Sequence, residues 1–159
     1  MASQTDIQCN IVEPPLAEQY ESKAIERLQS QGMRVTGPRR AVVRAMAETR
    51  KPMGAYEIRD QVAATGGKID VVSVYRILAS LVEAGLAHRI GIVDGYLACS
   101  GNHSGDHQTE HLVCESCGCV EEIPVPQTAL SEIGVSGSRL GFMARQTRVE
   151  VIGLCSHCR

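Results

Sequence analysis

Apolar residues recur at helical spacing through the first half of the chain, and this pattern predicts four helices. They run from about residue 17 to 31, from a cap at Thr36 through Met46, from Ala55 to Val62, and from a cap at Asp70 to Gly85. The last is the clearest, because its apolar residues follow the i, i+3, i+4, i+7 pattern: Val74, Ile77, Leu78 and Leu81. Prolines and glycines near the predicted ends support these boundaries. Helices this closely spaced indicate a compact bundle.

Two short apolar segments follow, at about residues 86–93 and 96–99, with Asp94-Gly95 between them. Asp-Gly favours the primed turns that join two antiparallel strands. We therefore predict a β-hairpin that turns at Asp94-Gly95. A helix-turn-helix followed by a hairpin is the arrangement of a winged-helix domain. In such a domain, the second helix of the helix-turn-helix motif reads DNA.

The second half of the chain has a different pattern. Residues 99–107 are small and polar and predict a hinge between two domains. Beyond them we expect a strand into Cys114, a strand through Val120 and Ile123, a glycine-interrupted helix over about 128–140, and a strand over about 148–152. The predicted fold class is α+β: a mobile arm (1–16), an N-terminal winged helix-turn-helix domain (17–98), the hinge, and a small C-terminal α/β domain (108–159).

Composition and charge sharpen this division. Only 3% of the 159 residues are aromatic, so the core must consist mainly of aliphatic side chains. The net charge of −2 argues against nucleic-acid binding, but residues 20–93 hold 12 Lys and Arg against 7 Asp and Glu, whereas residues 94–159 hold 4 against 8. Neither a secretory signal nor a membrane-spanning run is visible, so we expect a cytoplasmic protein that makes no membrane contact.

Two Cys-x-x-Cys pairs, Cys114 with Cys117 and Cys155 with Cys158, carry the strongest chemical signal. Four thiolates brought together form a closed tetrahedral site for structural zinc. Two disulfides would instead need an oxidising compartment and a framework of paired cysteines, whereas this chain has 7 cysteines and no secretory signal. The sequence therefore predicts a zinc site with four cysteine ligands.

A basic segment surrounds the second predicted helix and holds six cations: Arg34, Arg39, Arg40, Arg44, Arg50 and Lys51. Such a segment can clamp DNA phosphates, although on its own it is also typical of a solvated helix face. The helix that begins after Asp70 would lie in the major groove, where an arginine can bind guanine through two hydrogen bonds. The candidate DNA-binding residues are Arg34, Arg39, Arg40, Lys51, Ser73, Tyr75 and Arg76.

Four motifs together resemble the ferric uptake regulator family. In family order they are residues 33–40 (MRVTGPRR), 73–78 (SVYRIL) with Leu81 and Gly85-Leu86, 111–118 (HLVCESCG), and 155–158 (CSHC). The resemblance implies a homodimeric, metal-sensing transcription regulator and not an enzyme. It also implies that the C-terminal domain mediates dimerisation and that the partner is double-stranded DNA with a palindromic operator.

Within that family, the pattern of His88, Cys99, His107 and Glu122 resembles the regulatory metal site of the zinc uptake regulators. A thiolate with imidazoles and a carboxylate suits zinc, whereas iron and manganese favour harder oxygen and nitrogen ligands. His111 is an alternative ligand in place of His107. The prediction is thus two Zn2+ per protomer, one structural and one regulatory.

The predicted function is a zinc-responsive repressor of zinc-uptake genes. A sensor of iron, manganese or peroxide remains an alternative, although such relatives carry a His-His-Asp-His run where this chain has residues 108–111 (QTEH). Two other classes stay open. One is a zinc hydrolase that uses His88, Cys99 and His107 with Glu122 as general base, and the other is a zinc module that only binds partner proteins.

Overall fold

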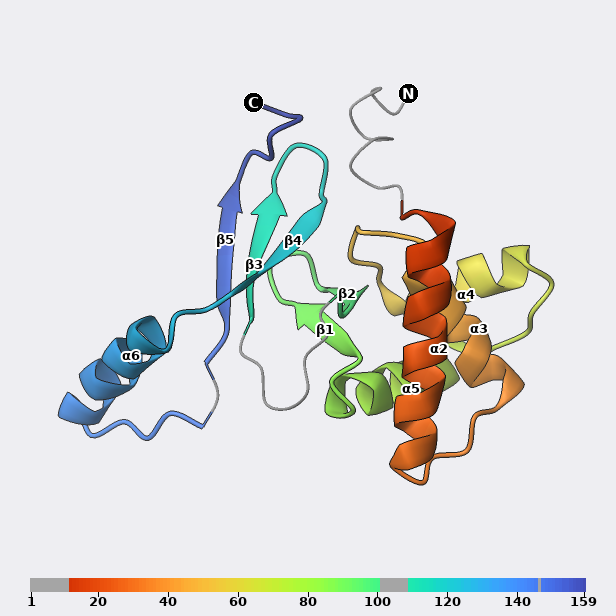
Figure 1. The fold of residues 1–159 in the computed structure, drawn as a ribbon, viewed down its shortest axis with the longest axis horizontal. Coiled ribbons are helices and arrows are strands. Elements are labelled where there is room, and N and C mark those ends of the chain that lie inside the picture. Colours follow the sequence, from red (N-terminus) through yellow and green to blue (C-terminus); the bar gives the residue numbers. More distant parts are fainter. Residues whose placement is uncertain (1–11, 101–108, 146) are drawn as a thin grey trace.

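The computed structural model describes residues 12–100, 109–145 and 147–159. The helices of the first half gather at one end of the molecule, and the C-terminal sheet lies with the last helix at the other (Figure 1). The small β-hairpin lies between these two parts. The predicted α+β class with a winged helix-turn-helix in the first half is confirmed. No helix in the described ranges is long and apolar enough to span a membrane.

The four predicted helices of the first half are present, and two of them are capped as predicted. They are α2 (Pro14–Ser30), α3 (Gly37–Ala47), α4 (Ala55–Ala64) and α5 (Val71–Glu83). The Thr36 side chain accepts a hydrogen bond from the backbone N–H of Arg39, and the Asp70 side chain accepts one from that of Ser73. Helix α2 begins three residues earlier than predicted, because a proline in the first turn lacks an N–H that the turn leaves unbonded anyway.

A single apolar cluster holds these helices together. Its fully buried side chains include Leu28 of α2, Met46 of α3, Ile58 of α4 and Leu78 of α5, so each helix contributes to the same core. Helix α5 buries its predicted stripe of Val74, Ile77, Leu78 and Leu81. The opposite side of α5 is left to solvent, with Val72 and Tyr75 about half exposed.

The hairpin forms, but its turn lies elsewhere than predicted. Strand β1 (Ala87–Ile90) pairs with β2 (Gly95–Ala98), so that Ile90 stands opposite Gly95 and residues 91–94 make the turn. Gly95 belongs to the strand because a Cβ atom there would lie 2.7 Å from the Cβ of Pro52. The next residue along, Tyr96, exchanges two backbone hydrogen bonds of 2.9 Å with Met53. The prediction of a turn at Asp94-Gly95 was wrong because this tertiary contact outweighs the local turn preference.

The C-terminal sheet has the strand order β4-β3-β5. Strand β3 (Thr109–Cys114) pairs antiparallel with β4 (Val120–Pro124) and parallel with β5 (Val149–Gly153), and α6 (Gln127–Arg139) lies in the crossover between β4 and β5. None of the residues of α6 is buried. Around it several large apolar side chains are exposed: Ile133, Val135, Leu140, Phe142 and Met143.

A second, smaller core joins the hairpin to this sheet. It consists of Ile90 and Leu97 from the hairpin and Val113 and Val120 from the sheet, each at most 5% exposed. Next to it, the backbone N–H of Val120 donates to the carbonyl of Arg50, which precedes α4. The two halves therefore meet at a defined interface, and the candidate metal ligands lie along it.

Candidate metal centres and nucleic-acid interface

The two Cys-x-x-Cys pairs meet at one end of the sheet. The sulfur atoms of Cys114, Cys117, Cys155 and Cys158 all lie within 4.8 Å of one another. The Sγ atoms of Cys117 and Cys155 are 3.8 Å apart. Sulfurs bound at about 2.3 Å to a tetrahedral zinc are separated by about 3.8 Å, so this arrangement fits zinc.

Local backbone structure prepares these thiols to act as ligands. Gly118 adopts a left-handed conformation (φ 74°) that lets its N–H donate to the carbonyl of Cys114, which closes the first cysteine loop. Burial raises the pKa of Cys114, but backbone N–H donors, chiefly those of Cys117 and Cys155, outweigh it and lower the pKa to about 6. Cys114 is therefore a thiolate at neutral pH, which is the form that binds metal.

A second cluster of ligand groups lies where the hairpin meets the sheet. His88 of β1, His111 of β3 and Glu122 of β4 place ligand atoms within 4.8 Å of one another. The Nε2 atom of His88 is 3.5 Å from Oε1 of Glu122, and the rings of His88 and His111 are 4.9 Å apart. His111 and Glu122 stand directly opposite each other in the β3–β4 register. This cluster draws ligands from both halves of the molecule.

A bound metal ion would satisfy buried polar atoms of this cluster. Nε2 of His111 and Oε1 of Glu122 are buried and accept or donate no hydrogen bond among the described residues. Burying such atoms without a partner costs stability, and a bound cation removes that cost. Burial, followed by the proximity of His88, lowers the pKa of His111 and keeps its ring neutral, as metal ligation requires. The residues present thus fit a metal ion.

Cys99 lies beside this cluster and is buried at 7% exposure. Its N–H donates to the carbonyl of Leu86, so the hairpin register puts its side chain diagonally across from His88 on the same face. The next residue, Ser100, donates its hydroxyl to Oε2 of Glu122 at 3.0 Å. Cys99 is not among the three residues whose ligand atoms lie within 4.8 Å, and His107 lies outside the described residues. The structure therefore brings His111, the alternative ligand, to the cluster.

Tyr20 of α2 forms a hydrogen bond close to Cys99. The Tyr20 hydroxyl donates a 2.7 Å hydrogen bond to the carbonyl of Leu86, the same acceptor that the Cys99 N–H uses. Burial, followed by the charges of Cys99 and Glu122, raises the pKa of Tyr20, so the hydroxyl keeps its proton. A cavity of about 320 Å³ opens beside these residues between α2 and β4. Helix α2 and Cys99 are thus hydrogen-bonded to the same backbone carbonyl, that of Leu86.

The candidate DNA-binding residues are divided between solvent and internal contacts. Tyr75 and Arg76 of α5 are exposed and project from the helix that the winged-helix fold presents to DNA. Ser73 is occupied, because its hydroxyl donates to the Asp70 carboxylate at 2.6 Å. Arg39 donates to the carbonyl of Arg34 in the segment before α3.

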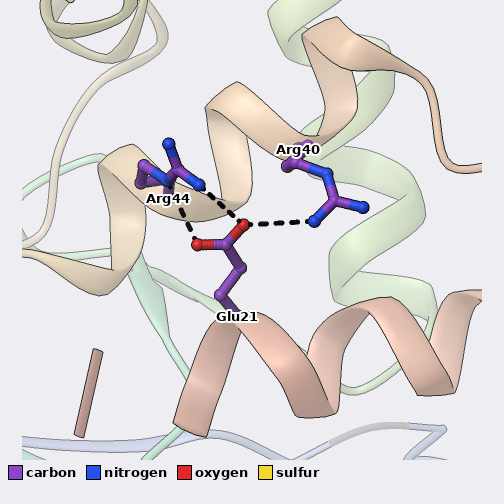
Figure 2. A network of polar contacts seen from close by, with 3 residues as sticks. All are labelled: Glu21, Arg40 and Arg44. Carbon is purple, nitrogen blue, oxygen red and sulfur yellow. Dashed lines mark hydrogen bonds and ion pairs between the residues drawn. The ribbon is translucent and has the colours of Figure 1, made fainter. Parts of the chain in front are cut away.

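The remaining basic residues contact acidic groups or the C-terminal half. Figure 2 shows Arg40 and Arg44 of α3 both pointing at Glu21 of α2, with separations of 3.5 Å for Arg40 and 3.1 Å for Arg44. Glu21 has no local sequence signal that distinguishes it from other helical glutamates. The Cδ atom of Lys51 lies 4.0 Å from the position that a Cβ atom would take at Gly118, beside the four-cysteine site.

A winged helix joined to a sheet with two candidate metal centres defines a metal-binding protein of the DNA-binding class. The ferric uptake regulator family model matches residues 30–151. The chain belongs to this family, whose members are transcription regulators and not enzymes.

Relatives within the family carry two kinds of name. A zinc uptake regulation protein of Mycobacterium tuberculosis is 29% identical over 135 residues, covering 83% of this chain and 99% of that protein. The zinc uptake regulation protein of Escherichia coli is 24% identical over 147 residues, covering 92% and 85%. A ferric uptake regulation protein of Legionella pneumophila is 27% identical over 140 residues, covering 84% and 97%.

Solved structures of zinc uptake regulators share the fold. A zinc uptake regulator complexed with zinc and DNA has a TM-score of 0.80 at 24% identity, covering 89% of this chain and 94% of that one. The holo form of XcZur has a TM-score of 0.76 at 28% identity, covering 88% and 96%. Its apo form has a TM-score of only 0.50 at 30% identity, covering 89% and 97%. The arrangement of this chain is thus much closer to the holo form.

Proposed function

We propose that this protein is a zinc-responsive transcriptional repressor that controls zinc-uptake genes, and that its zinc-loaded homodimer binds operator DNA. The observation that carries this proposal is the cluster of His88, His111 and Glu122. It takes ligands from the hairpin of β1 and β2, which is the wing of the winged helix, and from the C-terminal sheet. Metal binding at such a cluster stabilises one arrangement of the two halves over others.

We assign two zinc ions to each chain. The four cysteines would hold the structural ion, and His88, Cys99 and Glu122 would hold the regulatory ion together with His107 or His111. Zinc supplies positive charge and strong coordination bonds to these side chains. The buried thiol of Cys99 on the His88 face supports zinc over harder metals.

The regulatory ligands would act by fixing the angle between the wing and the sheet. The TM-scores of 0.76 and 0.50 against holo and apo XcZur support a metal-linked change of arrangement in a relative. Moving the DNA-competent fraction from 1:99 to 99:1 takes about 5.5 kcal/mol of differential affinity. A zinc site can supply roughly 10 kcal/mol or more, which is sufficient.

Operator recognition would use one α5 helix from each of two subunits. Tyr75 and Arg76 would contact base edges, and the arginines around α3 together with Lys51 and Ser73 would contact phosphates. The exposed apolar side chains on and after α6 support a dimer, because a surface of this kind is typical of a subunit interface. Two-fold symmetry then requires a palindromic operator. A DNA target is consistent with a cytoplasmic protein.

A DNA-binding titration with metal tests the proposal. Duplexes would be selected from a random pool with zinc-saturated protein, and the best one titrated by fluorescence anisotropy before and after mild chelation that leaves the four-cysteine site filled. We expect zinc to tighten binding by about 5- to 150-fold. Cys99→Ser should bind weakly with or without added zinc. Equal affinity of the two wild-type forms would reject metal regulation.

An iron-sensing role is the second candidate, because one relative is a ferric uptake regulation protein at 27% identity. The same titration with Fe2+ or Mn2+ in place of Zn2+ separates the two candidates. Our proposal expects zinc to restore DNA binding at the lowest free concentration of metal.

A further inference from the structure

Glu150 of β5 makes two short contacts with the tip of the wing. Its Oε1 atom accepts a 2.7 Å hydrogen bond from the N–H of Gly91, and its Oε2 atom accepts a 2.9 Å hydrogen bond from the N–H of Ile92. Both oxygens are thus used, by donors 58 and 59 residues away in the chain. Neither the regulatory nor the structural metal centre includes this carboxylate.

The geometry is that of an anion held by consecutive backbone donors. Two successive N–H groups that converge on one carboxylate form a small anion-binding concavity. Hydrogen bonds to an ionised acceptor are roughly twice as strong as neutral ones. A Cβ atom at Gly91 would lie 3.4 Å from Oε1, the distance of ordinary van der Waals contact, so the carboxylate packs directly against the backbone of the wing tip.

Glu150 connects the wing to both metal centres through its strand. It stands opposite His111 in the β3–β5 register, and β5 ends at Gly153, just before Cys155 of the four-cysteine site. On the other side of the contact, the turn at residues 91–94 continues directly from β1, which carries His88. The carboxylate therefore holds the wing tip against the edge strand that runs from beside His111 toward the four-cysteine site.

Of the contacts described across this interface, the other side-chain pairs are weaker or belong to the metal cluster. Arg50 and Glu121 approach to 3.5 Å with side chains 45% and 63% exposed, and such surface pairs contribute little. His88 and Glu122 are candidate ligands. Among the polar contacts described between the halves, Glu150 thus offers the one ionised side chain that holds backbone donors without serving as a ligand.

We propose that Glu150 is a positioning residue, which holds the wing against the C-terminal sheet in the arrangement that binds DNA. This inference rests on the proposed function, because the arrangement matters only if metal controls DNA binding. Glu150 would act with the regulatory metal: the ligands close the interface near its centre, and the carboxylate closes it at the wing tip. Without it, the metal-loaded protein would spend more time with the wing detached.

The test compares Glu150→Ala and Glu150→Gln with the wild type, and uses Glu26→Ala on the exposed face of α2 as the matched loss of a glutamate. Native mass spectrometry should find wild-type zinc content in all four proteins. At saturating zinc, Glu150→Ala should bind the selected duplex about tenfold more weakly, the effect of losing about 1.4 kcal/mol. Glu150→Gln keeps one acceptor oxygen and should fall between. Glu26→Ala should match the wild type.

Hydrogen exchange separates this inference from the proposed function. In zinc-saturated Glu150→Ala, the amides of Gly91 and Ile92 should exchange at least several-fold faster, while those of α5 keep wild-type rates. If the DNA affinity of the wild type is the same with and without zinc, the proposed function fails. The exchange result would still stand. Unchanged exchange at both amides together with wild-type DNA affinity would overturn the positioning role. If Glu150→Ala loses structural zinc, Glu150→Gln decides by the same two measurements.

Discussion

The two halves of the molecule are stabilised in different ways. The N-terminal helices share one large core, in which Leu28, Met46, Ile58 and Leu78 are almost completely buried. The C-terminal half has no comparable core among its described residues: α6 buries none of its side chains, and the buried residues of the sheet are mostly cysteines, His111 and two valines. The first half is therefore stabilised by apolar burial. The second half depends on metal ligation and on its contacts with the hairpin.

Removing one cysteine ligand should break the weaker half and spare the stronger one. Cys114→Ser should lose the structural zinc, and with it a stabilisation on the order of 10 kcal/mol, so that β3, β4 and β5 unfold. The helical core needs no metal and should persist. Zinc analysis together with hydrogen exchange measures both halves in one sample.

Cys119→Ser provides the control for that substitution. Cys119 is buried at 5% exposure next to the four ligands but is not one of the four whose sulfurs come together. The variant should keep its structural zinc and its protected sheet amides. Loss of zinc from Cys119→Ser, or retention of zinc by Cys114→Ser, would contradict the assignment of the four-cysteine site.

Creating a cavity in the helical core should destabilise the N-terminal half and leave the structural zinc in place. Leu78 is completely buried at the centre of the N-terminal cluster, so Leu78→Ala should lower the free energy of unfolding of that half by about 2–5 kcal/mol. Chemical denaturation followed by circular dichroism measures the change. The structural zinc should remain bound at the midpoint of the helical transition, and its release together with the helices would show that the halves unfold as one.

Replacing Arg76 should separate DNA reading from metal sensing. Arg76 is exposed on α5 and is not one of the candidate metal ligands. Arg76→Ala should cost about 1–3 kcal/mol in DNA binding and relax the base preference at one position of the operator. Zinc content and thermal stability should stay at wild-type values, which differential scanning fluorimetry checks. A variant that keeps wild-type sequence preference would remove Arg76 from the interface.

How far the sequence predicts the structure depends on the range of the interactions. The four helices and the caps at Thr36 and Asp70 were correct because apolar spacing and capping residues act within a few positions. The four cysteines come together as predicted, because two Cys-x-x-Cys pairs in one chain are typical of a zinc site. The hairpin turn was wrong because Gly95 is fixed by Pro52, 43 residues earlier in the sequence.

The regulatory cluster shows where sequence reasoning stops. His88 and Glu122 come together as expected, and the residue that joins them in the described structure is His111, which stood as an alternative. His107 lies outside the described residues, so the choice between the two histidines stays a prediction. Glu150 had no local signal at all, since its partners are two backbone N–H groups in a distant turn.

The central claim is that a second metal ion bridges the wing and the C-terminal sheet. Native mass spectrometry of zinc-saturated protein, before and after mild chelation, tests it most directly. We predict two zinc ions per chain in the wild type, one of them removable, and a single, chelation-resistant ion in both His88→Ala and Glu122→Ala. Two ions in either variant, or one ion in the saturated wild type, would contradict the claim.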